Sequence, residues 1–386
     1  MSRSILPEPP EELKQLSLAL RDKILLEIAA DGLIPFRRFM EMALYEPGLG
    51  YYSAGLHKFG ASGDFVTAPE LGSLFAATLA RQLGQVADEL GAYDILELGA
   101  GTGRLCADLL NNLAKDHQPN RYLILERSAD LRSVQQHVIA AQVPNWQDRV
   151  KWISQPLTEP WDGVLLANEM IDALAVERFR IGVNGIEQLC VGFKDEQFTW
   201  RHRAAPKDLD QAVYSLGLTR QEAYVSEINL RLEDWLKTVS DGLRKGLALF
   251  IDYGYPQSEY YLEERRQGTL MCHYRHRAHD NVFFWPGLQD ITAFVDFTAL
   301  AESAERCGLD MAGYTSQSMF LLACGIDKII GRQIMKDESA ALNIRAEARQ
   351  LTMPDCMGER FQVMALTRQL DLPLTGFTLR DLRHRL

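Results

Sequence analysis

Apolar residues recur every three or four positions in the first part of the chain. Between residues 10 and 31 they fall at Leu13, Leu16, Leu20, Ile24 and Ile28. This spacing predicts an amphipathic helix. Two further helical stretches are expected at residues 35–44 and at about 70–90, on either side of a glycine-rich loop. The first 90 residues are therefore predicted to form a helical N-terminal extension.

Short apolar runs replace the helical spacing after residue 92. Strands are expected at residues 93–98, 122–125, 149–153 and 163–167, and helices at about 104–115 and 129–140. Later in the chain, a buried strand is expected at residues 246–251, a late strand at 361–366, and a helix at 298–307. Strands that alternate with helices at this spacing predict an α/β fold with a mostly parallel sheet and helices on both of its faces.

Residues 176–203 interrupt this alternation with three short strand-like segments. The turn residues Asn184-Gly185 and Lys194-Asp195 separate them, so the segments predict an inserted antiparallel β meander. A helix is expected at about 226–240, and strand-like segments near 311–323. The predicted domains are the extension over residues 1–90 and a core over 91–386, with insertions at about 176–225 and 255–300.

The composition is that of a globular protein, since 47% of the 386 residues are apolar and 24% are charged. The formal net charge of -11 makes the chain a poor non-specific binder of nucleic acid, and no apolar run approaches the length of a membrane span. The N-terminus resembles neither a secretory signal nor a mitochondrial transit peptide, and the six cysteines form no C-x-x-C pair. We therefore expect a cytoplasmic protein with reduced thiols and without nucleic-acid or membrane partners.

The most informative motif is Glu97-Leu-Gly-Ala-Gly-Thr-Gly103, between a predicted strand and a predicted helix. Glycines allow a tight turn and let the backbone approach a ligand closely, and the helix beyond offers unpaired amide groups. A second acid, Glu126, ends the next predicted strand. A carboxylate at that place can accept hydrogen bonds from both hydroxyls of a ribose. A nucleoside-containing cofactor is therefore expected at Glu97, Gly99, Gly101, Gly103 and Glu126.

Two enzyme classes use this layout: nicotinamide or flavin enzymes, and S-adenosylmethionine methyltransferases. The dinucleotide motif is G-x-G-x-x-G, whose last glycine lies inside the helix. Here the spacing is G-x-G-x-G, and an acid precedes the first glycine by two residues. S-adenosylmethionine has no pyrophosphate, so the packing glycine of the dinucleotide motif is unnecessary. The motif therefore favours S-adenosyl-L-methionine as cofactor and a class I methyltransferase with a Rossmann-like fold.

The segment from Asn168 to Leu174 follows another predicted strand and is expected to contain the transfer site, because ligands bind at the carboxyl ends of parallel strands. It lacks the paired prolines of base-modifying methyltransferases, N/D-P-P-Y/F, and carries Glu169 and Asp172 instead. These carboxylates suit a cationic acceptor. We expect Glu169, Asp172 and Asp252, which ends a later strand, to be catalytic. The alternative is that Glu169 and Asp172 cap the following helix.

Residues 272–279 contain one cysteine and three histidines, a composition that is typical of metal sites. Zinc motifs, however, bring separated pairs of ligands together, and Arg275 and Arg277 would repel a cation. A loop that binds substrate or packs over the active site is the favoured interpretation, and no metal is expected.

Several segments resemble those of the MidA-type family of S-adenosylmethionine-dependent methyltransferases, which includes a mitochondrial complex I assembly factor that methylates protein arginine. They are Tyr45–Tyr52, Gly63–Glu70, Glu97–Gly103, Asn168–Leu174, Ile251–Gly254, Gly268–Leu270, Pro286–Phe297 and Met357–Phe361. The similarity runs in order from about residue 38 to residue 366. The sequence departs from the family pattern at Ala68, Ala100 and Met170-Ile171, and these differences concern the acceptor pocket rather than the cofactor.

The resemblance implies a class I methyltransferase core with S-adenosylmethionine as cofactor and inserted segments over the pocket. It implies that Gly63, Thr67 and Pro69 line the cofactor pocket near its methionine end, with Asn168 also in that site; the alternative is that Gly63 and Pro69 only shape a loop. It further implies a protein substrate, with a side chain such as arginine as methyl acceptor. A small-molecule acceptor, and an assembly factor that binds S-adenosylmethionine without turnover, are the other interpretations.

Overall fold

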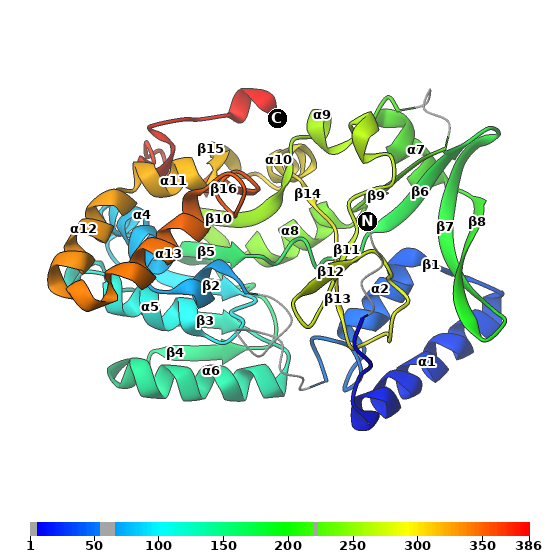
Figure 1. Ribbon diagram of the computed structural model, residues 1–386. Helices are drawn as coiled ribbons and strands as arrows, with labels where there is room; N and C mark the ends of the chain where they lie inside the picture. The colour runs from blue at the N-terminus through cyan, green and yellow to red at the C-terminus, as the bar shows by residue number, and fades with distance from the viewer. Residues whose placement is uncertain (1–5, 55–65, 219–222) are drawn as a thin grey trace. The chain divides into compact units, whose positions relative to one another are not determined.

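The computed structural model describes residues 6–54, 66–218 and 223–386. The chain forms two compact units, each assembled from separate stretches of sequence (Figure 1). The sheet unit comprises residues 66–171, 232–257 and 295–386, and the meander unit comprises the described residues of 1–65, 172–231 and 258–294. Residues 66–90, grouped above with the N-terminal extension, thus pack in the sheet unit. The predicted division into domains at residue 90 stays a prediction.

An eight-stranded sheet forms the centre of the sheet unit, in the order β15-β16-β10-β5-β2-β3-β4 with β14 beside β10. The strands are β2 (Asp94–Leu98), β3 (Tyr122–Leu125), β4 (Val150–Ile153), β5 (Trp161–Asn168), β10 (Leu243–Tyr255), β14 (Val295–Asp296), β15 (Asp310–Ser316) and β16 (Phe361–Arg368). β16 is antiparallel to β10 and β15, and the other pairings are parallel. The predicted mostly parallel sheet is confirmed.

The strand order of this sheet reverses at β2. The chain runs from β2 outward through β3 to β4, and then returns to β5 on the other side of β2. The connections that leave the carboxyl ends of β2 and β5 therefore diverge. In open α/β sheets, ligands bind in the crevice at such a point, outside the carboxyl ends of the strands.

Helices cover both faces of the sheet, as predicted (Figure 1). Along β10, Leu247, Leu249 and Ile251 point to the face that also buries apolar side chains of α4 and α5. Phe250 points to the other face, where its ring lies 6.1 Å from that of Trp235 in α8. This alternation is expected of a strand that is buried on both sides. The helices concerned are α3 (Ala68–Leu71), α4 (Leu74–Leu90), α5 (Arg104–Asn112), α6 (Ala129–Gln142), α8 (Leu232–Ser240) and α10 (Phe297–Arg306).

The segment after β15 departs from the predicted pattern. A continuous strand-like stretch near 311–323 is wrong, because β15 ends at Ser316 and α11 (Gln317–Ala323) follows it. The helices α12 (Ile326–Lys336) and α13 (Ala341–Thr352) were not predicted, although their buried side chains join the same core as α4. Short 3-10 helices lie at Lys115–His117, Pro144–Trp146, Glu263–Arg265, Glu338–Ala340, Thr375–Phe377 and Arg383–Arg385.

A five-stranded antiparallel sheet dominates the meander unit, in the order β1-β7-β6-β9 with β8 beside β7. The strands are β1 (Ile34–Pro35), β6 (Glu177–Gly182), β7 (Gly185–Lys194), β8 (Gln197–Ala204) and β9 (Tyr224–Ile228). Strands β6, β7 and β8 confirm the predicted meander. The helix expected at about 226–240 is wrong in its first part, because the backbone of β9 pairs with β6, a strand that is distant in sequence.

Two helices, α1 (Glu11–Asp31) and α2 (Phe36–Tyr45), contribute to the core of the meander unit. α1 buries Leu20, Ile24 and Ile28, the second half of the predicted apolar face. A further sheet of three strands has the order β12-β11-β13. The remaining elements are α7 (Lys207–Ser215), α9 (Gln257–Tyr260), β11 (Met271–Tyr274), β12 (Arg277–His279) and β13 (Asp290–Thr292).

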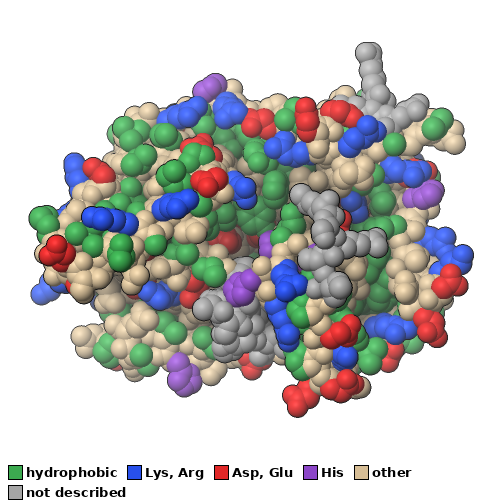
Figure 2. Space-filling model, viewed as in Figure 1, with side chains coloured by type: hydrophobic (Ala, Val, Ile, Leu, Met, Phe, Trp, Pro, Cys, Tyr) green, Lys and Arg blue, Asp and Glu red, His purple; other side chains and the backbone are tan. Residues whose placement is uncertain are grey.

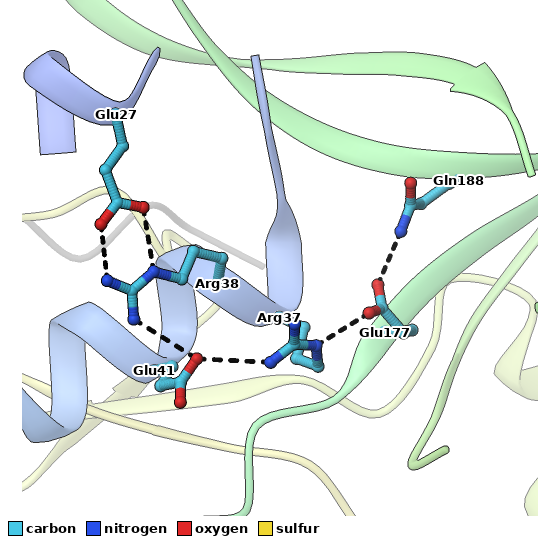
Figure 3. Close-up of polar contacts among 6 residues, drawn as sticks. All are labelled: Glu27, Arg37, Arg38, Glu41, Glu177 and Gln188. Atoms are coloured by element: carbon cyan, nitrogen blue, oxygen red, sulfur yellow. Dashed lines mark hydrogen bonds and ion pairs between the residues drawn. The ribbon is translucent and has the colours of Figure 1, made fainter. Parts of the chain in front are cut away.

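A polar network joins α1 and α2 to the meander. It consists of Glu27, Arg37, Arg38, Glu41, Glu177 and Gln188 (Figure 3). The guanidinium of Arg38 donates two hydrogen bonds to Glu27, at 2.5 and 2.9 Å, and Arg37 donates to Glu177 at 2.9 Å. The other oxygen of Glu177 accepts from Gln188 in β7 at 2.9 Å. The buried carboxylate of Glu177 is thus paired on both oxygens, and these bonds connect the helices to two strands.

Charged side chains of both signs are scattered over the face of the molecule shown in Figure 2. Within the described part of the chain, no helix has the length and apolar character needed to cross a membrane. All six cysteines are free thiols. The cytoplasmic location stays a prediction.

Glycines allow the central strands to approach closely near their amino ends. Gly163 of β5 lies opposite both Asp94 of β2 and Gly246 of β10. A Cβ atom on Gly163 would lie 1.9 Å from the carbonyl oxygen of Asp94, and one on Gly246 would lie 1.9 Å from that of Gly163. Because these neighbours are backbone atoms of paired strands, the register requires glycine at both positions.

We expect Gly163→Ala to lower the free energy of unfolding by about 3 kcal/mol or more, because the methyl group overlaps a backbone carbonyl in the centre of the sheet. Gly331→Ala is the control: Gly331 is exposed in α12 with open space around it, and alanine is favoured over glycine in a helix by up to about 1 kcal/mol. Urea denaturation of the two variants measures both effects. A Gly163→Ala protein as stable as its parent would contradict the register of β2, β5 and β10.

Candidate active site

Three glycines form the turn after β2. Gly99, Gly101 and Gly103 have φ values of +65°, +52° and +85°, in the left-handed region that favours glycine. Gly103 is the N-cap of α5, so the turn leads to a helix end whose first amides have no partner within the helix. The predicted succession of strand, glycine turn and helix is confirmed, and the turn lies at the carboxyl end of β2.

Glu126 lies directly after β3, at the same edge of the sheet. The last residues of β2 and β3 pair with each other, so Glu126 and Gly99 leave neighbouring strands together. The buried carboxylate of Glu126 accepts from the backbone N–H of Ser128 at 2.8 Å and from Nε2 of Gln135 at 3.1 Å. These bonds orient the carboxylate beside the glycine turn, where its role in binding ribose hydroxyls stays a prediction.

Two hydrogen bonds bring α3 to this edge. The hydroxyl of Thr102, within the glycine turn, donates to Glu70 at 2.5 Å. The backbone N–H of Ala68 donates to the carboxylate of Glu169 at 3.3 Å. The two bonds connect α3 with the loop after β2 and with the loop after β5. Three segments that are far apart in sequence therefore meet at the carboxyl ends of the central strands.

Thr67 and Pro69 belong to the start of α3. Thr67 is the N-cap of this short helix, and Pro69 lies in its first turn, where the missing N–H of proline costs no helical hydrogen bond. Both residues therefore lie beside the two bonds that attach α3 to the edge of the sheet. Gly63, the third residue expected in this segment, lies outside the described residues.

Glu169 follows the last residue of β5, Asn168, with a φ of +51°, a strained value for a residue other than glycine. Besides the Ala68 amide, its carboxylate accepts from Nδ2 of Asn168 at 3.2 Å. Residues 169–176 form bends and turns without a helix. The alternative that Glu169 and Asp172 cap a helix is therefore wrong, and Glu169 instead connects the end of β5 with α3.

Asp252 holds the same loop from the neighbouring strand, β10. Its side chain is 1% exposed. One carboxylate oxygen accepts from the backbone N–H groups of Met170 and Ile171, at 3.1 and 2.9 Å, and the other accepts from the N–H of Tyr253 at 2.9 Å. These contacts position the loop after β5, and a catalytic role of Asp252 stays a prediction.

Glu97 lies inside β2, two residues before the glycine turn, and is 3% exposed. One of its oxygens accepts from the hydroxyl of Tyr122 at 2.8 Å. Burial raises the pKa of Glu97 to about 7, against a smaller lowering by the hydrogen bond from Tyr122. The carboxyl group therefore titrates near neutral pH, and its contact with a cofactor stays a prediction.

The third expected catalytic acid, Asp172, belongs to the meander unit, whereas Glu169 and Asp252 belong to the sheet unit. Asp172 is 6% exposed, and its carbonyl oxygen accepts from the backbone N–H of Ala293 at 3.0 Å. This bond ties the first residues of the meander insertion to the end of the segment that contains β13. The catalytic role of Asp172 stays a prediction.

Two stacked tyrosines accompany Asp172 in the meander unit. The rings of Tyr45 and Tyr52 lie 5.6 Å apart at an interplanar angle of 19°, and the hydroxyl of Tyr52 donates to Asp290 at 3.0 Å. Burial, followed by the charge of Asp290 and a further contribution from Asp172, raises the pKa of each tyrosine. Both hydroxyls therefore stay protonated, and the cluster combines neutral aromatic rings with two carboxyl groups.

Gln135 and Trp152, which belong to no sequence motif, take part in the hydrogen bonds beside the glycine turn. Nε2 of Gln135, in α6, donates to the carbonyl oxygen of Gly101 at 3.0 Å as well as to Glu126. Its Oε1 accepts from Nε1 of Trp152, in β4, at 2.8 Å. Sequence reasoning missed both residues, because a glutamine inside a helix carries no motif and its partners are distant in sequence.

Residues 272–279 form the hairpin of β11 and β12, with a tight turn at Arg275 and His276. Cys272 is buried in the core of the meander unit. No group of three or more His, Cys, Asp and Glu side chains within residues 6–54, 66–218 and 223–386 is arranged to hold a metal ion. The Cys- and His-rich composition of this segment therefore belongs to a packed hairpin.

Comparison with known proteins decides the family. The profile of a family described as "Putative S-adenosyl-L-methionine-dependent methyltransferase" matches residues 76–315. A crystal structure of a Burkholderia thailandensis protein bound to S-adenosyl-homocysteine is 40% identical in sequence, superposes with a TM-score of 0.95, and covers 99% of this chain and 100% of its own. The chain belongs to this methyltransferase family.

Two curated relatives extend the comparison to animal proteins. Protein arginine methyltransferase NDUFAF7 homolog, mitochondrial, from Drosophila melanogaster is 24% identical, over 96% of this chain and 93% of its own length. Protein arginine methyltransferase NDUFAF7, mitochondrial, from Danio rerio is 26% identical, over 91% and 90%. The similarity therefore extends over nearly the whole of each chain.

The methyltransferase has the class I, Rossmann-like fold, and its cofactor is S-adenosyl-L-methionine, as predicted. The residues at the carboxyl edge fit this group. Oδ1 of Asn168 is buried and has no hydrogen-bond partner among the described residues, so it is suited to accept from a ligand. The glycine turn leaves the backbone accessible, and Glu126 offers a carboxylate to hydroxyl donors.

We expect Glu97→Gln to remove a pH dependence of stability. Because the pKa of Glu97 is raised to about 7 from an ordinary value of 4.5, the folded protein holds a proton in this range that the unfolded chain releases. The free energy of unfolding therefore falls as the pH rises through it. The variant escapes this loss, so its stability relative to the parent should rise by up to about 3 kcal/mol between about pH 5 and pH 8. Urea denaturation at both pH values measures the change, and parallel curves for the two proteins would contradict the proton uptake.

Proposed function

We propose that this methyltransferase acts on the guanidinium group of arginine in a protein substrate. The observation that carries the proposal is the carboxylate of Glu169, held at the carboxyl end of β5 by hydrogen bonds from Ala68 and Asn168. A carboxylate at this place can accept from a guanidinium N–H and direct one nitrogen toward the methyl group. The names of the Drosophila and Danio relatives, protein arginine methyltransferases, support the same acceptor.

The residues of the loop after β5 would act by orienting the guanidinium of the acceptor toward the methyl group. When bound, S-adenosylmethionine supplies the methyl group: the nitrogen–carbon bond forms as the carbon–sulfur bond breaks, the sulfur keeps the electron pair, and the nitrogen gives up a proton to water. A guanidinium stays protonated at neutral pH, so Glu169 would localise its charge on the nitrogens away from the methyl. Asp252 fixes the two amides that follow Glu169. Orientation of this kind can contribute roughly 7–11 kcal/mol to lowering a barrier.

The composition of this segment supports a cationic acceptor over a nucleic-acid base. Glu169-Met170-Ile171 stands where base-modifying enzymes have paired prolines and an aromatic residue. Asp172, three residues after Glu169, lies in the meander unit with Tyr45 and Tyr52. Carboxylates and aromatic rings are the groups that bind a guanidinium, so Asp172 and these two tyrosines form, within the meander unit, a second group whose chemistry suits a cationic acceptor.

The overall charge supports a protein acceptor over nucleic acid. The formal net charge is -11, and the face shown in Figure 2 carries acidic and basic side chains intermingled rather than one basic patch. A polyanion gains little attraction from such a surface. A protein segment that carries the acceptor arginine is cationic at that residue, so a net acidic enzyme does not repel it.

We expect Glu169→Gln to bind S-adenosyl-homocysteine within about twofold of the parent protein and to transfer methyl roughly 10- to 150-fold more slowly. The amide can still accept from the Ala68 N–H, but it loses the charge-assisted bond to a guanidinium, worth about 1.5–3 kcal/mol. The measurement is single-turnover transfer of labelled methyl to an extract of host cells that lack the gene. Mass spectrometry of the labelled material identifies the modified residue.

The control for this experiment is Asp94→Asn. Asp94 is also a buried carboxylate that accepts a backbone amide, that of Arg121, but it lies at the amino end of β2, the opposite edge of the sheet from Glu169. This variant should lose stability and keep the parent's transfer rate. Label found only on small molecules would contradict the protein acceptor. A Glu169→Gln protein as fast as its parent would return Glu169 to a structural role.

A further inference from the structure

The buried side chain of Gln135 contacts two of the segments at the carboxyl ends of the central strands. It lies in the middle of α6 and is 0% exposed. Its side chain reaches the glycine turn through the carbonyl oxygen of Gly101, at 3.0 Å, and the end of β3 through the carboxylate of Glu126, at 3.1 Å. One amide group thus bridges the two segments that the glycine motif and the acid after β3 contribute to the cofactor site.

Trp152 determines which way round this amide lies. Its indole Nε1–H can only donate, and it lies 2.8 Å from the amide of Gln135. The Gln135 oxygen must therefore face Trp152, and the NH2 group must face Gly101 and Glu126, both of which are acceptors. The reversed orientation would bring the NH2 group against the indole N–H, donor against donor, and the amide oxygen against the Glu126 carboxylate, acceptor against acceptor.

The packing around Gln135 leaves it little freedom to move. A Cβ atom on Gly103 would lie 3.2 Å from both Cα and Cβ of Gln135, so α6 packs directly on the last glycine of the turn. The Gln135 side chain is itself fully buried, and each of its polar atoms has a partner. A buried network in which every group is paired specifies one geometry, because each alternative leaves a buried group unpaired.

We propose that Gln135 is a positioning residue for the cofactor: it donates to the Glu126 carboxylate and to the Gly101 carbonyl, and thereby holds the acceptor of the ribose hydroxyls at a fixed distance from the glycine turn. Trp152 sets its orientation from β4. This role concerns the binding of S-adenosylmethionine and its product, and it is independent of the methyl acceptor proposed above.

The variant that tests this is Gln135→Met, which preserves the length of the side chain and removes its hydrogen bonds. We expect its affinity for S-adenosyl-homocysteine, measured by titration calorimetry, to fall at least about 10-fold, because Glu126 loses a charge-assisted donor. Gln82→Met is the matched control. Gln82 is also 0% exposed, in α4, and its amide bonds to Gln85 and to the backbone N–H of Gly376. It should lose comparable stability and bind S-adenosyl-homocysteine as the parent does.

Two further readouts separate positioning from packing. Without its donor, the Glu126 carboxylate should take up a proton more readily, so the pH below which S-adenosyl-homocysteine binding weakens should be higher in Gln135→Met than in the parent. In a Glu126→Gln background, the Gln135→Met substitution should change the affinity less than about threefold, since the two residues act as one unit. A role in packing alone would leave the pH dependence of binding unchanged, and Gln135→Met would lower the affinity by the same factor in both backgrounds.

Trp152→Phe keeps the test decisive if Gln135→Met does not fold. It preserves most of the ring and removes only the donor that orients the amide, so we expect a smaller loss of affinity, about 2- to 12-fold. The proposal is supported by weakened binding together with the shift of the pH dependence. It is overturned if Gln135→Met or Trp152→Phe binds S-adenosyl-homocysteine as tightly as Gln82→Met, or if the effect of Gln135→Met is undiminished in the Glu126→Gln background.

Discussion

The reversal of strand order between β2 and β5 is the constraint on which the sheet unit depends. Parallel strands on either side of this point send their following loops apart, and the crevice that results lies at the carboxyl ends of the strands. The glycine turn follows β2, Glu126 follows β3, Asn168 and Glu169 follow β5, and Asp252 lies in the corresponding part of β10. Residues separated by more than 150 positions in sequence are therefore brought to one edge by the topology alone.

Topology places these loops near one another, and buried hydrogen bonds then fix their conformation. Asp252 accepts two consecutive amides of the loop after β5, Glu70 accepts the hydroxyl of Thr102 in the glycine turn, and Gln135 bridges that turn to Glu126. The backbone N–H and C=O groups of an irregular loop find few partners within the loop itself. Side chains from neighbouring elements must therefore supply the partners. Side chains that fix the loops in this way reduce the ordering that ligand binding requires, and this favours binding.

The parts of this arrangement that were predictable from sequence carry local signals. The glycine spacing after an apolar run marks the turn after β2, because the backbone is left-handed at Gly99, Gly101 and Gly103 and such positions favour glycine. Alternating short runs mark the parallel strands. The meander was visible from its turn residues, Asn184-Gly185 among them. By contrast, β9 and α13 depend on pairing or packing with distant elements. Gln135 is the clearest example: nothing in its neighbourhood in sequence distinguishes it from an ordinary helical residue, and only the meeting of α6 with β4 and two loops gives it partners.

We expect the cofactor to be bound by the loops at the carboxyl ends of β2, β3 and β5. Hydrogen–deuterium exchange of the whole protein, with and without saturating S-adenosyl-homocysteine, tests it most directly, because exchange reports the opening of individual backbone segments. With the ligand, exchange should slow in peptides that cover residues 99–105, 126–131 and 168–171, and it should be unchanged in peptides from the amino ends of the same strands. Protection confined to the hairpin of β11 and β12, or to the amino ends of the sheet, would contradict it.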